Sequence, residues 1–150
     1  MTEVLFYHLE RAPLEDVLPG LLEKCLERSW RVVVQAGSEE RVAALDAHLW
    51  SYRDDSFLPH GAVGEGSAEA QPIWLTAGDD NPNKAAVRFL VDGAPARDFS
   101  GYDRIVYLFD GRDAEALSEA RGAWAVAKGA GHAVTYWQQA ANGRWEKKAG

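Results

Sequence analysis

Residues 103–111 read DRIVYLFDG, and this run constrains the fold more than any other part of the chain. It is almost continuously apolar, and its β-branched and aromatic residues favour a strand. Strict alternation would leave one face in water, whereas this run predicts a central strand that is buried on both faces. Such strands belong to mostly parallel sheets with helices on their faces.

The regions on either side of this run alternate between strands and helices. Downstream, the spacing predicts a helix over 113–128, capped by Asp113 and closed by Gly129 or Gly131, followed by a strand at 132–139. Further strands are predicted from their β-branched and aromatic content at 3–9, 30–37, 72–78 and 86–93. The strand at 86–93 could also lie at an edge of the sheet.

Two more helices are predicted in the first third of the chain. Apolar residues recur at helical spacing over 14–26, where Pro13 suits the first turn and Pro19 predicts a kink or a late start. Ser38 can cap the next helix, which ends near Trp50.

This order of elements predicts an α/β fold: a three-layer Rossmann-like domain with a mostly parallel central sheet. The 150 residues, 47% of them hydrophobic, suit one domain over 1–150. Residues 61–71 are expected to form a surface loop, and 141–150 a turn and a polar tail. The pattern leaves the strand order open.

The composition narrows the class of partner. The net charge is −7, with 23 acids against 16 bases, which argues against tight direct binding of DNA or RNA. No apolar run reaches the roughly 18 residues of a membrane span, and the N-terminus lacks a basic leader, so we expect a cytoplasmic protein with no membrane partner. Six tryptophans are many for this length, and tryptophan is favoured at binding surfaces.

The usual signatures of an enzyme are missing. Cys25 is the only cysteine and is expected to be a buried thiol, and the four histidines are scattered, so we expect no metal and no cofactor. The loops GxGxxG, GxxxxGK[ST] and GxSxG do not occur. Asp110 ends a strand where ligands bind in such folds, but a turn residue is the simpler interpretation. A nucleotide- or flavin-binding enzyme on a Rossmann-like scaffold remains the alternative.

The helix at 113–128 carries an unusual stripe. At 100° per residue, Leu117, Arg121, Trp124 and Lys128 fall within an arc of about 60°. Alanines form a second stripe suited to close packing on a sheet. The first stripe offers apolar area, a planar donor fork and a second cation, which suits an aromatic group beside a carboxylate. The alternative is a core tryptophan between two solvated cations.

At this point the chain resembles the chi subunit of bacterial DNA polymerase III holoenzyme, a clamp-loader accessory protein. The resemblance covers nearly the whole chain. It is most specific where a helix ending in LW is followed, after a few polar residues, by SFLPH. It continues in three further segments: FYHL near the start, ARGAWAVAKGAGHAVTY, and RWEKK near the end.

The resemblance implies a non-catalytic subunit that binds the acidic, phenylalanine-terminated C-terminal tail of single-stranded-DNA-binding protein. It also implies binding to the psi subunit, which links chi to the clamp loader. In some relatives an accessory DNA helicase competes for the same protein. In the family, the terminal phenylalanine of the tail enters an apolar pocket and its carboxylate meets an arginine.

Carried over by motif, that arginine matches Arg121, the neighbouring aromatic matches Trp124, and the loop aromatic matches Phe57. Phe109 is expected to be a further pocket wall. For Trp50 a structural role is expected, with a place beside Phe57 in the cleft as the alternative. The best-studied branch has a lysine where this chain has Leu117. That basic contact is then lost, or is supplied by Lys128 or by Arg112.

Overall fold

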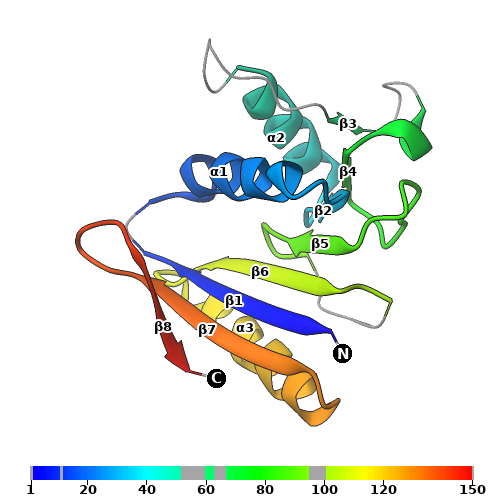
Figure 1. Ribbon diagram of the computed structural model, residues 1–150. Helices are drawn as coiled ribbons and strands as arrows, with labels where there is room; N and C mark the ends of the chain where they lie inside the picture. Colours follow the sequence, from blue (N-terminus) through cyan, green and yellow to red (C-terminus); the bar gives the residue numbers. More distant parts are fainter. Residues whose placement is uncertain (1, 11, 52–59, 63–66, 95–100, 150) are drawn as a thin grey trace.

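The computed structural model describes residues 2–10, 12–51, 60–62, 67–94 and 101–149 (Figure 1). The strands are β1 (Glu3–Leu9), β2 (Val32–Gln35), β3 (Gly61–Ala62), β4 (Ile73–Thr76), β5 (Val87–Leu90), β6 (Arg104–Asp110), β7 (Ala133–Gln139) and β8 (Trp145–Ala149). The helices are α1 (Leu14–Glu27), α2 (Glu39–Ser51) and α3 (Ala114–Gly129), with a single 3-10 turn at Ala68–Ala70.

The strands form one mostly parallel sheet in the order β3-β4-β2-β5-β6-β1-β7-β8. Each pairing among the described strands is parallel except the one between β7 and β8. The α/β class and the parallel sheet are therefore as the sequence predicts. β6, the apolar run at 103–111, lies between β5 and β1 in the interior of the sheet.

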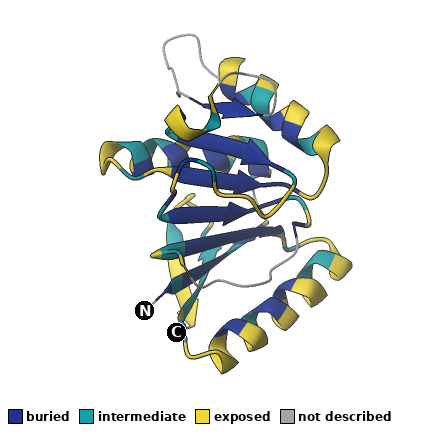
Figure 2. Cartoon of the chain, turned by 90° about the vertical axis from the view of Figure 1, so that its right-hand side faces the viewer, coloured by how far each residue is buried: buried dark blue, intermediate teal, exposed yellow. Residues whose placement is uncertain are grey.

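Alternation along the strands sends side chains to two faces with different covers. On β1, Tyr7 and Leu9 join the cluster that α1 and α2 complete, while Val4 and Phe6 join the cluster that α3 completes. The inner strands are buried on both faces and the helices are buried only toward the sheet (Figure 2). Cys25 lies in the first cluster as a buried thiol, and burial raises its pKa.

The strand at 86–93 is not an edge strand. β5 pairs with β2 on one side and with β6 on the other, so that alternative is wrong. Its polar Arg88 made an exposed edge plausible, yet Arg88 is only 5% exposed. Its guanidinium donates to the side chain of Gln35, to the carbonyls of Gly78 and Asp80, and to the Tyr102 hydroxyl. These acceptors compensate the burial of the charge.

Two short strands lie where loops were expected, and they are the two edges of the sheet. β3 falls within the predicted surface loop 61–71, and β8 falls within the predicted polar tail. β8 has a register shift against β7 and is exposed along most of its length. β3 has only two residues and β8 is mostly charged, so neither shows a hydrophobic run from which a strand could be predicted.

α1 runs through Pro19 without a late start, because it begins at Leu14. Proline has no N–H, so the carbonyl of Glu15, one turn earlier, loses its helical partner. That carbonyl accepts a hydrogen bond from Nε2 of His48 on α2, at 2.7 Å. The two helices are thus joined at the place where the proline interrupts the ladder.

The predicted helix caps are present. Ser38 Oγ accepts from the N–H of Arg41, and the carboxylate of Asp113 accepts from the N–H groups of Glu115 and Ala116. α3 ends at Gly129, and Gly131 follows with a φ of 87°, a conformation that favours glycine. This fixes both ends of the helix that carries the predicted stripe.

Candidate functional site

A pocket of about 300 Å³ opens between α3 and the strands β6 and β7. Most of its lining is apolar, and one charged side chain, Arg121, belongs to it. The lining residues are Phe109, Leu117, Ala120, Arg121, Trp124, Tyr136 and Ala149. We call this cavity the α3 pocket.

The alanine stripe of α3 explains why the pocket exists. Ala120, Ala123 and Ala127 are buried against the sheet, so the helix approaches it closely. The larger side chains of the neighbouring stripe then fall at the flank of the helix. Trp124 is half-buried there, with its ring centroid 5.5 Å from that of Phe6 and 6.0 Å from that of Tyr136. The indole is held by edge contacts and is not enclosed in the core.

The two cations of the stripe, Arg121 and Lys128, are exposed to solvent and can contact a ligand. Arg121 is exposed, and within the described parts of the chain no carboxylate lies at ion-pair distance from it. Lys128 is also exposed, and its Nζ lies 5.8 Å from the centre of the Trp124 ring. An anion at the mouth of the α3 pocket would therefore find a guanidinium that has no carboxylate partner among the described residues.

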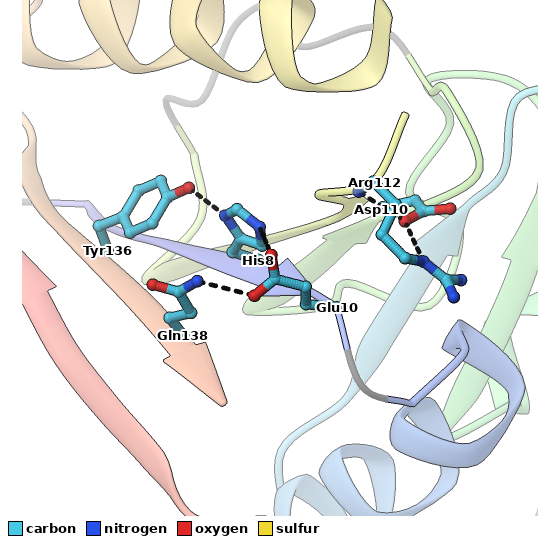
Figure 3. A network of polar contacts seen from close by, with 6 residues as sticks. All are labelled: His8, Glu10, Asp110, Arg112, Tyr136 and Gln138. Atoms are coloured by element: carbon cyan, nitrogen blue, oxygen red, sulfur yellow. Dashed lines mark hydrogen bonds and ion pairs between the residues drawn. The ribbon is translucent and has the colours of Figure 1, made fainter. Parts of the chain in front are cut away.

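The side chain of Tyr136, which lines the pocket, contacts the buried histidine His8 (Figure 3). The hydroxyl of Tyr136 lies 2.5 Å from Nδ1 of His8, which is 9% exposed at the end of β1. Nε2 of His8 faces Glu10 at 3.8 Å, and Gln138 donates to the same carboxylate at 3.0 Å. Burial raises the pKa of the Tyr136 hydroxyl, and the positive charge of Arg121 opposes that rise.

The turn after β6 closes over this histidine. A Cβ atom placed on Gly111 would lie 1.7 Å from Nε2 of His8, so only glycine fits. The preceding Asp110 accepts hydrogen bonds from the backbone N–H and from Nε of Arg112. The backbone N–H bond is the main reason that the pKa of Asp110 is lowered. Asp110 is thus a turn residue, as the simpler interpretation held.

Four of the predicted site residues meet in the α3 pocket: Phe109, Leu117, Arg121 and Trp124. Lys128 lies beside the same tryptophan, outside the lining. Phe57 lies outside the described residues. Leu117, where the best-studied branch of the resembled family has a lysine, is part of the apolar wall.

The alternative that Trp50 joins this cleft is wrong, because Trp50 does not line the α3 pocket. α2 packs against α1, β3 and β4, whereas α3 packs against β6, β7 and β1, farther along the sheet. Trp50 is 49% exposed, and its ring lies 4.2 Å from that of His60, centre to centre. The alternative stood open because the strand order could not be predicted from the sequence.

Tyr136 and Ala149 line the pocket but were not predicted. Tyr136 alternates with its neighbours on β7, and alternation alone does not tell which face of the sheet meets α3. Ala149 reaches the pocket because β8 pairs with β7 so that Ala149 lies opposite Tyr136. Its sequence carries no signal for that role.

A larger cavity, of about 540 Å³, lies at the carboxyl ends of β1, β5 and β6, where nucleotides bind in related folds. We call it the strand-end cavity. Its charged lining consists of Glu15, Asp92, Asp110, Asp113, Glu115 and Glu119 against Arg41 and Arg112. An excess of acids repels phosphate groups.

The described residues contain neither a membrane-spanning helix nor a candidate metal site. None of the helices there is both long and apolar enough to cross a bilayer. No group of three or more His, Cys, Asp or Glu side chains is arranged there to hold a metal ion.

Comparison with known proteins points in one direction. A family model described as "DNA polymerase III chi subunit, HolC" matches residues 1–135. A probable DNA polymerase III subunit chi from Rickettsia prowazekii is 28% identical over 91 residues, which are 61% of this chain and 55% of that protein. A DNA polymerase III subunit chi from Pseudomonas aeruginosa is 34% identical over 86 residues, 55% of this chain and 59% of that protein. The chain thus spans little more than half the length of each of these curated relatives.

Proposed function

Because the family model matches most of its length, the chain belongs to the DNA polymerase III chi subunit family, and we propose that it is a non-catalytic accessory subunit of the clamp loader. In this proposal the α3 pocket binds the acidic C-terminal tail of single-stranded-DNA-binding protein. A psi subunit joins the chain to the clamp loader, and an accessory helicase is a further candidate partner. The chain acts as one Rossmann-like domain over 1–150, three layers deep, with no cofactor.

One observation carries the tail-binding proposal: the exposed guanidinium of Arg121 lies at an apolar pocket and has no carboxylate partner among the described residues. A peptide that ends in phenylalanine brings a ring and a carboxylate on the same residue. The ring suits a lining of Leu117, Trp124 and Tyr136, while the carboxylate suits the guanidinium. At about 300 Å³ the pocket is small enough to take a single side chain.

The energies expected for this contact give a moderate affinity. Burying one phenylalanine ring contributes about 2–3 kcal/mol. A bidentate arginine–carboxylate contact contributes about 1.5–3 kcal/mol. After the entropy lost on association, a micromolar dissociation constant is expected. Several tails on one tetramer would raise their local concentration and strengthen the attachment.

Cations near the pocket favour the acidic residues of the tail. Lys128 lies next to Trp124, whereas Arg112, which is also exposed, contacts the carboxylate of Asp110 at 3.2 Å. Of the two, Lys128 is the better candidate to supply the positive charge that Leu117 does not provide. Charges on exposed side chains interact through water, so binding should weaken as salt is added.

The test is a titration with an acidic peptide that ends in phenylalanine. We expect Arg121→Ala to weaken binding at least tenfold, with an unchanged melting temperature because Arg121 is exposed. Lys84→Ala, which removes an exposed cation elsewhere, is the matched control. The parent protein should also lose binding when the terminal phenylalanine is deleted from the peptide. Unchanged affinity in Arg121→Ala would reject the α3 pocket as the site.

A further inference from the structure

The opposite face of the sheet carries a second groove, of about 490 Å³, which the proposed tail contact does not use. One wall is the flank of α1, including Lys24 and Arg28. The other wall is formed by aromatic side chains of β1, β7 and β8, on the part of this face beyond α1. We call this the aromatic groove.

Four partly exposed aromatic rings line it, and the buried ring of Phe89 lies among the other lining residues. Tyr7 and Trp137 are register partners on β1 and β7, and their ring centroids lie 6.3 Å apart. Trp145 of β8 meets Tyr7 edge to face at 4.9 Å, and Trp30 completes the set. All four are half-buried, so part of each ring reaches solvent. Three of the six tryptophans of the chain are therefore collected in one groove.

The charge of the groove is opposite to that of the whole chain. Lys24, Arg28 and Arg104 line it against a single acid, Glu27, although the chain carries a net charge of −7. The guanidinium carbons of both arginines lie 5.0 Å from the centre of the Trp30 ring. Arg104 also contacts Glu3 at 3.2 Å, outside the lining.

A further cation lies beside the rings. Lys147 is the register partner of Trp137, so its side chain points to the same face of the sheet. Cations thus stand on both sides of the aromatic strip, on α1 and on the strands. Positive side chains therefore outnumber negative ones at this groove, although acids outnumber bases in the whole chain.

From this arrangement we propose that the aromatic groove binds single-stranded nucleic acid. Unpaired bases stack on exposed aromatic rings, and arginines and lysines beside those rings neutralise the phosphates. A duplex keeps its bases paired and cannot use the rings. An acidic peptide could use the cations but would leave most of the aromatic surface without a partner. The net charge keeps the binding weak and limits it to low salt.

This inference does not depend on the tail-binding proposal. Trp137 faces the aromatic groove, while its neighbour Tyr136 faces the α3 pocket on the other side of the same strand. The two ligands would therefore lie on opposite faces, and neither would block the other.

The experiment is a fluorescence-anisotropy titration of a labelled oligothymidylate of about 12 nucleotides at low salt. If about three phosphates are neutralised, affinity should fall about 20-fold between 50 and 200 mM salt. Arg28→Glu should weaken binding about tenfold and reduce the salt slope by roughly one. Lys84→Glu makes the same charge change at an exposed site elsewhere and should bind like the parent.

A second variant tests the rings. Trp145→Ala, on the exposed edge strand, should weaken oligothymidylate binding about tenfold while the melting temperature reports whether the fold is kept. Arg121→Ala should bind the oligonucleotide normally, so a failed tail site and a failed groove are told apart.

Three results would overturn the proposal. The first is no binding by the parent at 50 mM salt, and the second is equal losses in Arg28→Glu and Lys84→Glu. The third is an acidic peptide without aromatic residues that binds as tightly as the oligonucleotide and is equally sensitive to Arg28→Glu. That last outcome would make the groove a protein-docking site.

Discussion

The contact between Gly111 and His8 makes a sharp prediction at the scale of single residues. A methyl group on Gly111 would overlap the imidazole, so Gly111→Ala must displace the ring or the turn. We expect the free energy of unfolding to fall by about 1–3 kcal/mol in a urea titration. Affinity for the tail peptide should fall several-fold as well, because Tyr136 loses the partner of its hydroxyl.

Gly122→Ala is the matched control for this change. A Cβ atom on Gly122 would meet nothing within 4 Å, and alanine is the better helix former by about 1 kcal/mol. That variant should be as stable as the parent or more so. A Gly111→Ala protein with unchanged stability would show that the ring moves aside without cost.

The residues of the α3 pocket show how much of a site can be predicted from sequence. Leu117, Arg121 and Trp124 could be grouped beforehand because helical spacing is fixed by the backbone itself. Tyr136 could not, because its place in the pocket depends on a strand order and a register that distant segments determine together. The role of His8 could not be predicted either, because it depends on contacts with Tyr136 and Gly111 that only the fold creates.

At the scale of elements, the α1–α2 contact can be tested through the proline that interrupts the ladder. His48→Phe removes the donor to the Glu15 carbonyl and should cost about 1–2 kcal/mol. Pro19→Ala restores a backbone N–H that can make this bond within the helix. The loss on His48→Phe should therefore be smaller by about 1 kcal/mol in the Pro19→Ala background.

A double-mutant cycle measured by urea unfolding checks this coupling. His48→Gln, which keeps a donor, should lose less stability than His48→Phe. Strictly additive effects of the two substitutions would mean that the histidine stabilises the helices by another route.

The same pair of helices should respond to acid through Glu15. Its carboxylate accepts from Arg41 at 2.7 Å, and Arg41 also donates to Asp92, so α1, α2 and the end of β5 are linked. Burial opposes the shift, but hydrogen bonds from its own backbone N–H and from Arg41 lower its pKa below 4.5. The ionised form therefore favours the folded state above the unfolded pKa, and its contribution is lost as pH falls through the folded pKa.

We accordingly expect Glu15→Gln to be less stable than the parent at pH 7. The difference should shrink below about pH 4.5 and vanish once the carboxyl is protonated in the folded state. Denaturation midpoints measured across this range check the sign. A constant difference at every pH would show that packing is responsible and that the charge is not.

The elements also show what hydrophobic patterns can and cannot resolve. Long apolar runs such as β6 and the three helices were predictable because burial demands many apolar residues in regular order. β3 is two residues long and β8 reads WEKKA, so neither shows the period of a buried strand. Each is recognised as a strand only by its pairing, β3 with β4 and β8 with β7.

At the scale of the whole molecule, the strand-end cavity can test whether the chain is a non-catalytic subunit, as proposed, or an enzyme of similar fold. Its lining has six acids against two arginines, in the place where phosphates bind in nucleotide-dependent relatives of this architecture. We expect ATP, FMN and NAD at millimolar concentration to leave the melting temperature unchanged, because a ligand stabilises only a protein that binds it.

A thermal-shift panel with these three compounds makes the measurement, and the acidic tail peptide serves as the positive control. A rise of several degrees with any nucleotide would favour the enzyme alternative. Repeating that condition with Arg41→Ala would then show whether the strand-end cavity holds the ligand.

The charge distribution is also a property of the whole molecule. A net charge of −7 argues against general attraction to nucleic acid, yet Arg121 lines the α3 pocket and three cations line the aromatic groove. The composition could predict the first statement but not the second, because local charge depends on which elements the fold brings together.

The arrangement of β8 has a practical consequence for anyone who handles the protein. Ala149 lines the α3 pocket, and two residues earlier Lys147 lies on the face of the sheet that carries the aromatic groove. An affinity tag, a fluorescent protein or a surface tether joined behind Ala149 would start at the rim of one cavity and strain the strand that borders the other. Such fusions would report false negatives for both ligands, so labels belong at the amino terminus, and pull-downs made with carboxyl-terminal tags should be repeated.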